Sequence, residues 1–543
     1  MAYQPSLSPE LYVRAGTARD LALMDRLAEE SRSPTGTDRT KPRVTLMVGP
    51  SPFSMPRGWE FFLTSPYEGV TYIASVLENA GYPVRIVDVR YDRTPLETAL
   101  REAEVDTDVL GVATFEDNYP WVEELVNQFK AKHPDKIVLL GGSLVTSVPH
   151  VFMRETRADV AVISEGELTI LEVMDAITDD ALMSRAPQIN GIWYRSSDGE
   201  VKRTAARGQM LNLDALPNMN LSLWPQAKDP RGLQPQIISS HSRGCKMDCS
   251  FCYRTTPQLR EKSPEKLRSE LKYLKETYQI KFIFFVDLTF TSNKKRTLAI
   301  CDVISEFDLR WTCLTRCADV DPEILAAMKR AGCDIVLYGV ESLTPDALKD
   351  ARKGSTENLA ERAYRLTTDA GLRFGGLIIV GLPNETPRSM DHTASWAEKN
   401  QSITRVKYLS AMPGTSVYTQ AKESGIIADE RRHLQWLAVE EALHRDEFLN
   451  YNGVSDQAMR EMYERVYNSY NEGPVMDFQH WPEHFAYYDP DPSRPWRKDF
   501  SSAGGVIPPE FERFRGLHIE NTRRRDLVSG PMLTRPLDLV PGV

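Results

Sequence analysis

The chain has 543 residues, of which 41% are hydrophobic and 26% charged, and its formal net charge is −10 at pH 7. This balance is typical of a folded protein with several cores and excludes a disordered or fibrous chain. The acidic charge argues against a protein held to nucleic acid through its phosphates, and no apolar run approaches the length of a membrane span. The first six residues have neither a basic nor an apolar region, which argues against a secretory signal.

The first 42 residues show little hydrophobic periodicity, so we expect a helical leader followed by a flexible link. From residue 43 to 189, apolar runs of strand length alternate with segments of helical period. The expected strands are residues 44–48, 84–89, 109–113, 137–140 and 160–163. This alternation predicts an α/β domain with a doubly wound, Rossmann-like parallel sheet and helices on both faces.

Small and polar residues follow the fourth and fifth of these strands. They are Gly141, Gly142 and Ser143 after the fourth, and Glu165 and Gly166 after the fifth. Because glycine lets the backbone approach a ligand closely, and such sheets bind ligands at the carboxyl ends of their strands, we predict a ligand-binding edge here. An ordinary sheet in which the glycines only turn the chain is the alternative.

Residues 190–235 differ in character, with a predicted hairpin at 192–203 and then a loop rich in Pro, Asn and Leu that is expected to be a domain linker. A second alternation of strands and helices occupies residues 236–423. Its expected strands are residues 236–241, 282–286, 310–314, 335–340, 377–380 and 406–409. Six repeats predict a partial (βα)6 barrel of the TIM type, whose chemistry lies on the loops after the strands.

Residues 424–543 are expected to form a small, mainly helical C-terminal domain, with amphipathic helices at 431–445 and 455–470. We expect this domain to close over the open side of the barrel and to help select the substrate. Trp481 and Tyr488 are candidates for the wall of the cavity. The alternative is that these aromatic residues only cover the barrel.

Three of the seven cysteines, Cys245, Cys249 and Cys252, stand together directly after the first expected barrel strand. This spacing is expected by chance only about 0.001 times in a chain with so few cysteines, and the low count favours a reducing cytoplasm. Three thiolates on one loop can hold three corners of an iron–sulfur cluster and leave one iron open. A zinc site with His241 as the fourth ligand is the alternative.

The remaining cysteines lie in or beside apolar segments, so we expect buried free thiols there. They are Cys301, Cys313, Cys317 and Cys333.

The Cys-x-x-x-Cys-x-aromatic-Cys motif after the first strand of a six-repeat barrel resembles the radical S-adenosylmethionine superfamily. The region in front of it is similar to a cobalamin-binding domain, through Gly141-Gly142-Ser143 with Thr146 and Pro149 and then Glu165-Gly166-Glu167. Together, residues 43–423 resemble the cobalamin-dependent radical S-adenosylmethionine enzymes. The resemblance implies three cofactors, namely a [4Fe–4S] cluster on the three cysteines, S-adenosylmethionine and cobalamin.

The resemblance also implies roles for single residues. Those expected near S-adenosylmethionine are Phe251 (cluster or adenine), Asp287 (methionine ammonium, directly or through a neighbour), Arg316 (carboxylate), Glu341 (ribose or amino group), and Gly376 and Gly381 (adenine). Those expected near cobalamin are Gly141, Gly142, Ser143, Thr146, Glu165 and Gly166. For any acidic residue at a strand end, a helix N-cap or a solvated charge is the alternative.

The Asp-x-His-x-x-Gly motif, whose histidine ligates cobalt from below in other cobalamin domains, is absent from the sequence. His133 and His150 are the two histidines of this half, and neither has an aspartate two residues before it. We therefore expect cobalamin to be bound base-off. The chain also contains no dinucleotide fingerprint, Walker loop or zincin motif, so nicotinamide, nucleoside-triphosphate and zincin chemistry have no support.

The function implied by the resemblance is transfer of a methyl group from S-adenosylmethionine, through methylcobalamin, to an unactivated carbon or a phosphinate phosphorus. The substrate would be a small molecule or natural-product intermediate, and a flavodoxin or ferredoxin would supply electrons. Ring contraction or oxidative cyclisation is the alternative within the family, and a cobalamin sensor or carrier is an alternative outside catalysis. Since both ligand edges are carboxyl ends of parallel strands, they are expected to face each other across a shared cavity.

Overall fold

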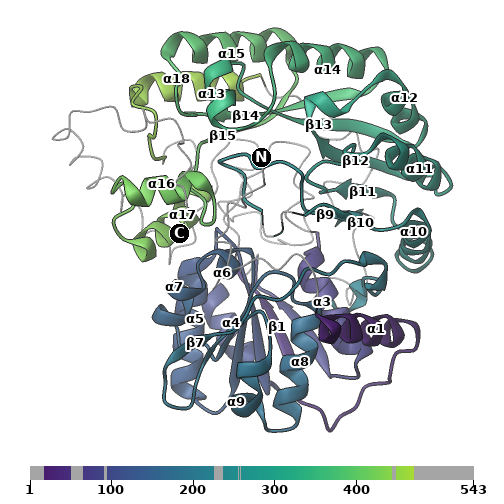
Figure 1. Ribbon diagram of the computed structural model, residues 1–543, viewed down its shortest axis with the longest axis vertical. Helices are drawn as coiled ribbons and strands as arrows, with labels where there is room; N and C mark the ends of the chain where they lie inside the picture. Colours follow the sequence, from purple (N-terminus) through teal and green to yellow (C-terminus); the bar gives the residue numbers. More distant parts are fainter. Residues whose placement is uncertain are drawn as a thin grey trace.

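The computed structural model describes residues 17–50, 65–90, 94–225, 236–254, 256, 258–442 and 448–469. Within these residues the chain forms two α/β parts, one above the other in Figure 1. The first is built on a seven-stranded sheet and the second on a six-stranded sheet. Among the described residues, no helix combines the length and the apolar character needed to span a membrane.

The first sheet confirms the doubly wound arrangement. Its strand order is β2-β1-β3-β4-β5-β6-β7, and β1 to β5 run parallel. The strands are β1 (Val44–Val48), β2 (Val84–Asp88), β3 (Val109–Thr114), β4 (Ile137–Gly142), β5 (Val160–Val162), β6 (Ile192–Arg195) and β7 (Val201–Arg203). The predicted hairpin β6–β7 pairs antiparallel with β5 and so extends this sheet, whereas the sequence analysis had ended the first domain before it, at residue 189.

Helices cover both faces of the first sheet, with α1, α3 and α8 packed together on one face and α4 and α5 on the other. The helices of this part are α1 (Ala18–Arg32), α3 (Glu68–Asn79), α4 (Pro95–Glu104), α5 (Tyr119–Lys132), α6 (Ser143–Ser147), α7 (Pro149–Glu155), α8 (Glu167–Thr178) and α9 (Leu182–Arg185). Helix α1 precedes the first strand, and the other helices lie between strands, in several cases where connections between parallel strands require them.

The leader helix α1 is an integral part of this first domain. Thr17 and Asp20 form a capping box at its start, and Leu23 and Leu27 are buried against the core. Asp20 is itself buried, and its carboxylate accepts a hydrogen bond from Arg207 at 2.5 Å. The sequence predicted a helix here but missed its packing, because the partner Arg207 is far away in the chain.

The second sheet is the predicted open barrel, with its six parallel strands side by side in chain order. The strands are β8 (Gln236–Ser239), β11 (Phe282–Phe285), β12 (Arg310–Thr315), β13 (Cys333–Glu341), β14 (Arg373–Val380) and β15 (Ile403–Tyr408). The helices on its outer side are α10 (Pro264–Tyr278), α11 (Lys294–Ser305), α12 (Pro322–Arg330), α13 (Pro345–Asp350), α14 (Glu357–Asp369) and α15 (Pro387–Asn400).

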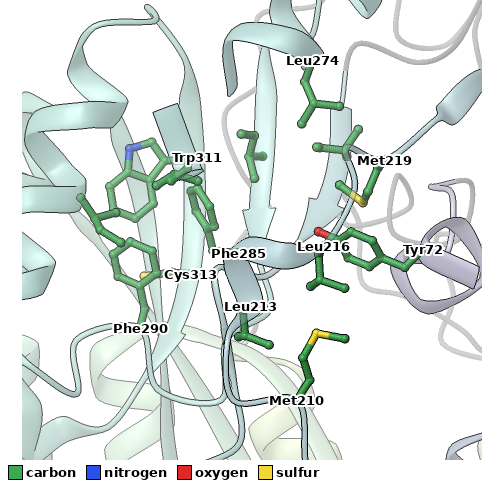
Figure 2. Close-up of a cluster of buried hydrophobic side chains, with 14 of the residues drawn as sticks. Tyr72, Met210, Leu213, Leu216, Met219, Leu274, Phe285, Phe290, Trp311 and Cys313 are labelled. Atoms are coloured by element: carbon green, nitrogen blue, oxygen red, sulfur yellow. The ribbon is translucent and has the colours of Figure 1, made fainter. Parts of the chain in front are cut away.

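The segment expected to be a linker fills part of the seam between the two sheets. Figure 2 shows Met219 between Tyr72 of α3 and Leu274 of α10, with Leu216 and Leu213 on the side away from Leu274. Trp224 is fully buried, and its ring nitrogen donates to the Thr71 hydroxyl at 2.9 Å. This packing adds apolar contact between the two domains, so their relative position is set by a continuous core.

The last described helices are α16 (Ser416–Glu423), α17 (Glu430–Ala442) and α18 (Asp456–Tyr467). Helix α17 packs on α5 of the first domain, where Arg431 pairs with Glu123. Helix α18 packs on α15 and on β15, the edge strand of the second sheet. A cap over a shared cavity remains a prediction. Trp481 and Tyr488, the predicted cavity-wall residues, lie outside the described residues.

Candidate functional site

The three clustered cysteines lie on a loop whose base is closed by a short antiparallel pair, β9 (Ser242–Arg243) and β10 (Arg260–Glu261). Gly244, just before Cys245, has φ +83°, and a Cβ there would lie 2.2 Å from the Gln258 carbonyl oxygen. Only glycine fits this close approach of two backbones. The local sequence therefore determines how the loop leaves the barrel edge.

All three thiols are free, and the groups that lie near them come from segments that follow different strands. The Cys245 sulfur lies 3.7 Å from the Thr289 hydroxyl, and the Cys249 sulfur lies 3.8 Å from the Arg352 carbonyl oxygen. Burial raises the pKa of the Cys249 thiol and raises that of Cys252 to about 12. Binding of a metal cluster must therefore displace protons from these thiols.

His241, the alternative zinc ligand, is paired with Asp287. Its ring Nδ1 is hydrogen-bonded to the Asp287 carboxylate, and both side chains are buried. Within the part of the chain that the structure describes, no three His, Cys, Asp or Glu side chains converge on a point for a single metal ion. A cluster with several corners, which spreads its ligands apart, fits three thiols on one loop better than a single ion does.

Asp287 is buried beneath the start of the cysteine loop, with 1% of its surface exposed. Besides His241, the Ser242 hydroxyl donates to its carboxylate. Burial opposes its charge, but the pairing with His241 and Ser242 outweighs this and lowers the pKa of Asp287. The sequence placed Asp287 near the methionine ammonium, directly or through a neighbour, and this remains a prediction.

Phe251 and Glu341 lie together with Lys353, a residue that the sequence did not single out. The Lys353 ammonium donates to Glu341 at 2.6 Å and lies 5.9 Å from the centre of the Phe251 ring. Glu341 has φ +64°, a conformation that a non-glycine residue rarely adopts and that often marks functional sites. The turn that carries Lys353 also accepts a hydrogen bond from the Ser250 amide, through the Ala351 carbonyl at 3.0 Å.

Arg316 supports the same turn. Its guanidinium lies 3.4 Å from the Lys353 carbonyl oxygen, 3.3 Å from that of Gly354 and 3.4 Å from the Asp319 carboxylate. The side chain therefore lies at the predicted edge, with the turn as its partner.

Gly376 and Gly381 are explained by packing. A Cβ on Gly376 would lie 2.7 Å from the Ile403 side chain of β15, and one on Gly381 would lie 2.6 Å from Met459 of α18. Gly381 also has φ +91°. The structure thus shows close contacts with protein at the two positions where the sequence predicted an adenine.

At the cobalamin edge, Gly141 borders open space, since a Cβ there would have no atom within 4 Å. Gly142 has φ +120°, and its Cβ would lie 2.4 Å from the Thr114 carbonyl oxygen, so this glycine is required by the turn itself. The Thr146 hydroxyl donates to the Gly142 carbonyl at 2.8 Å and accepts from the Ser164 amide at 3.0 Å. The open position at Gly141 fits a ligand that approaches the backbone closely.

The cysteine loop and the cobalamin edge are in direct contact. The hydroxyl of Tyr253, next to Cys252, donates to the Ser143 carbonyl, and the Ser147 hydroxyl donates to Tyr253 at 3.2 Å. As expected from the sequence, the two carboxyl edges therefore face each other. The shared cavity between them remains a prediction.

Glu165 is paired with two arginines, and its contact with cobalamin remains a prediction. Its carboxylate accepts from Arg243 at 3.0 Å and from Arg260 at 2.7 Å, both at the base of the cysteine loop. Gly166 begins α8, where a Cβ would lie 3.0 Å from the Ile73 side chain. The two residues join the domains and shape the end of β5.

Comparison with known proteins identifies both domains. Residues 239–397 match the model of the radical SAM superfamily, and residues 64–174 match that of the B12 binding domain. An uncharacterized methyltransferase of Pyrococcus horikoshii is 30% identical over 374 residues, which cover 67% of this chain and 80% of that protein. The chain belongs to the cobalamin-dependent radical S-adenosylmethionine enzymes.

Other members of this family are more distant. An anaerobic magnesium-protoporphyrin IX monomethyl ester cyclase of Rubrivivax gelatinosus is 27% identical over 342 residues, or 61% of this chain and 62% of the cyclase. The methyltransferase TsrM from Kitasatospora setae has the same fold, with a TM-score of 0.60 and 15% identity over 89% of this chain and all of TsrM. The enzyme OxsB gives a TM-score of 0.56 and 17% identity, over 77% of this chain and 62% of OxsB.

Family membership makes a [4Fe–4S] cluster, S-adenosylmethionine and cobalamin the cofactors of this radical S-adenosylmethionine enzyme. The donor set agrees with these groups on two counts. The three free thiols suit an iron–sulfur cluster, and the open side of Gly141 suits a bound corrinoid.

The buried Lys353–Glu341 pair predicts a large effect of removing one charge. Both side chains are 10% exposed, so Lys353→Met leaves a buried carboxylate without its partner and should lower the free energy of unfolding by about 3 kcal/mol. Urea unfolding measures this. Lys294→Met, which removes the exposed pair with Asp321, should cost less than about 1 kcal/mol. An equal effect of the two variants would contradict the prediction.

Glu385 predicts a pH-dependent stability. Burial raises its pKa from 4.5 to about 7, against hydrogen bonds from the Ser342 hydroxyl and the Gly381 and Leu382 amides. Between pH 4.5 and about pH 7, the Glu385 carboxyl holds a proton in the folded chain that it has lost in the unfolded chain. The stability of the folded chain should therefore fall as pH rises, by at most about 1.4 kcal/mol per pH unit.

Urea unfolding across this pH window tests the Glu385 prediction. Glu385→Gln should flatten the profile relative to the unmodified chain, whereas the exposed Glu276→Gln should leave it unchanged. Parallel profiles for the chain and Glu385→Gln would show that Glu385 is ionised throughout.

Proposed function

We propose that this enzyme is a methyltransferase, which moves a methyl group of S-adenosylmethionine by way of cobalamin to an unactivated carbon or a phosphinate phosphorus of a small molecule. The observation that carries this proposal is the contact of the cysteine loop with the cobalamin edge through Tyr253 and Ser143. A substrate between two such close edges can reach both cofactors. The name of the Pyrococcus relative also favours methyl transfer.

In this proposal the cluster is held by Cys245, Cys249 and Cys252, and the corrinoid lies against Gly141. When bound, the cofactors supply a transferable methyl group and a carbon radical that removes a hydrogen atom from the substrate. The protein's part is to hold these groups in register and to keep water from them.

The other predicted site residues are proposed to act in two ways, either by direct contact with S-adenosylmethionine or by holding neighbouring segments in place. Phe251 and Glu341, which lie together with Lys353, are proposed to contact S-adenosylmethionine directly. Asp287 and Arg316 are proposed to act by holding the cysteine loop and the Lys353 turn in place. Their contacts with protein support this division of roles.

Oxidative cyclisation is the second candidate, and the 27% identity to the Rubrivivax cyclase favours it. The two reactions share the cofactors and differ in whether a methyl group leaves S-adenosylmethionine.

The proposal also includes a flavodoxin or ferredoxin as electron donor and a cytoplasmic location. The free thiols support the latter, because reducing compartments keep cysteines unpaired.

The test uses anaerobically reconstituted full-length enzyme with S-adenosylmethionine labelled in its methyl group, a strong reductant, and metabolite fractions of the producing cell. Methyl transfer predicts label in the protein-bound corrinoid and in a small-molecule product, together with 5′-deoxyadenosine. Product and 5′-deoxyadenosine without label in either fraction would favour cyclisation and overturn the proposal. The Cys249→Ala protein is the matched control and should yield no 5′-deoxyadenosine.

A further inference from the structure

The cysteine loop is held by the cobalamin domain at both of its ends. At its base, Arg243 donates to Glu165 at 3.0 Å and to Glu167 at 2.6 Å. At its far end, the Tyr253 hydroxyl donates to the Ser143 carbonyl. The three cluster cysteines lie between these two attachments, so the loop bridges two successive strand ends of the first sheet.

The two attachments differ in strength and in role. Arg243 is buried among carboxylates, and although burial opposes its charge, Glu167 and Glu165 raise its pKa well above the usual value. Arg260, the cross-strand neighbour of Arg243, donates to the same Glu165. This is the stronger attachment, since removing Arg243 would take the charged partner from the buried Glu167.

The attachment at Tyr253 is a single hydroxyl with two partners. Ser143 is the first residue of α6 and Ser147 is the last, and the Ser147 hydroxyl donates to Tyr253 at 3.2 Å. On one side Tyr253 adjoins the cluster ligand Cys252, and on the other it contacts the turn that follows Gly141 and Gly142. A displacement of either loop would change this contact first.

We propose that Tyr253 is a positioning residue that couples assembly of the cluster to binding of cobalamin. The inference rests on the proposed function only in requiring that the chain binds both cofactors. Ligation of Cys252 fixes the backbone next to Tyr253, and its hydroxyl then holds the first turn of α6 in the conformation that cobalamin meets. Cobalamin, by ordering the same turn, favours the conformation of the loop that receives the cluster.

Thermodynamic linkage makes the two effects equal in size. One net hydrogen bond corresponds to a change of about fivefold in an equilibrium constant. The cluster-loaded enzyme should therefore bind cobalamin at least about fivefold more tightly than the cluster-free enzyme.

The experiment titrates hydroxocobalamin into cluster-free and cluster-loaded full-length protein under anaerobic conditions and follows the corrinoid absorbance. The quantity measured is the ratio of the two dissociation constants. In Tyr253→Phe the ratio should fall to about one, and Ser147→Ala, which alters the contact from the other side, should reduce it as well. Tyr338→Phe is the matched control, because it removes a hydroxyl bonded to Thr367 at 2.8 Å within the barrel, and should keep the full ratio.

A merely structural role of Tyr253 would weaken binding in both forms alike and leave the ratio unchanged. An unchanged ratio in Tyr253→Phe, or a ratio of one in the unmodified chain, would overturn the inference while leaving the proposed function intact. Absence of cobalamin binding in every form would overturn the proposed function, and the inference with it.

Discussion

Replacement of any one of Cys245, Cys249 and Cys252 by alanine should abolish the iron–sulfur cluster, because the two thiolates that remain on the loop cannot hold it. The reconstituted unmodified chain should contain about four irons and four sulfides, and each variant less than about a tenth of this. Iron and sulfide analysis with the visible absorbance measures the loss, and reductive cleavage of S-adenosylmethionine should disappear with it. Zinc in place of iron in strictly anaerobic protein would contradict the assignment.

The control for this experiment is a cysteine of the barrel core. Cys301 and Cys333 are 2% and 3% exposed and lie in the hydrophobic core around Trp311. Cys301→Ala should therefore keep the full iron content, with a loss of stability of about 1 kcal/mol from the small cavity. Loss of iron in Cys301→Ala would show that the effect is not specific to the loop.

Gly141→Trp should weaken cobalamin binding by roughly 100-fold or more while the cluster is retained. The structure leaves open space on the Cβ side of Gly141, so the indole can enter without a clash and would occupy the place of the ligand. Equilibrium titration with hydroxocobalamin measures the loss, and iron content reports the cluster. Gly36→Trp, at an exposed glycine with equally open surroundings, should bind cobalamin normally.

Gly142 is unsuited to the same test, although its neighbouring position in the sequence makes the two glycines look equivalent. Its φ of +120° and the nearness of the Thr114 carbonyl mean that any side chain would distort β4 itself. Undiminished binding by Gly141→Trp would mean that cobalamin lies elsewhere. The bound corrinoid should also give a base-off spectrum, since the sequence lacks the histidine motif that ligates cobalt.

Much of the fold follows from local sequence. The apolar run at 44–48 predicts β1 with its observed bounds, and the amphipathic segment at 455–470 predicts α18 (Asp456–Tyr467). Such segments carry their own periodicity, and strand and helix periods differ enough to be told apart. The hairpin at 192–203 was equally visible, but its sequence does not reveal which sheet it joins.

For the site, too, some features could be predicted from local sequence and others could not. The spacing of Cys245, Cys249 and Cys252 in the sequence indicated an iron–sulfur cluster, because three thiolates on one loop suit iron, and the resemblance of the motif to that of the radical S-adenosylmethionine superfamily implied the class of enzyme. Lys353, the pairing of Glu165 with Arg243 and the contact of Tyr253 with Ser143 were decided only by the tertiary structure. The last two contacts join residues 78 and 110 positions apart, and no local pattern predicts such partners because packing of the two domains creates them.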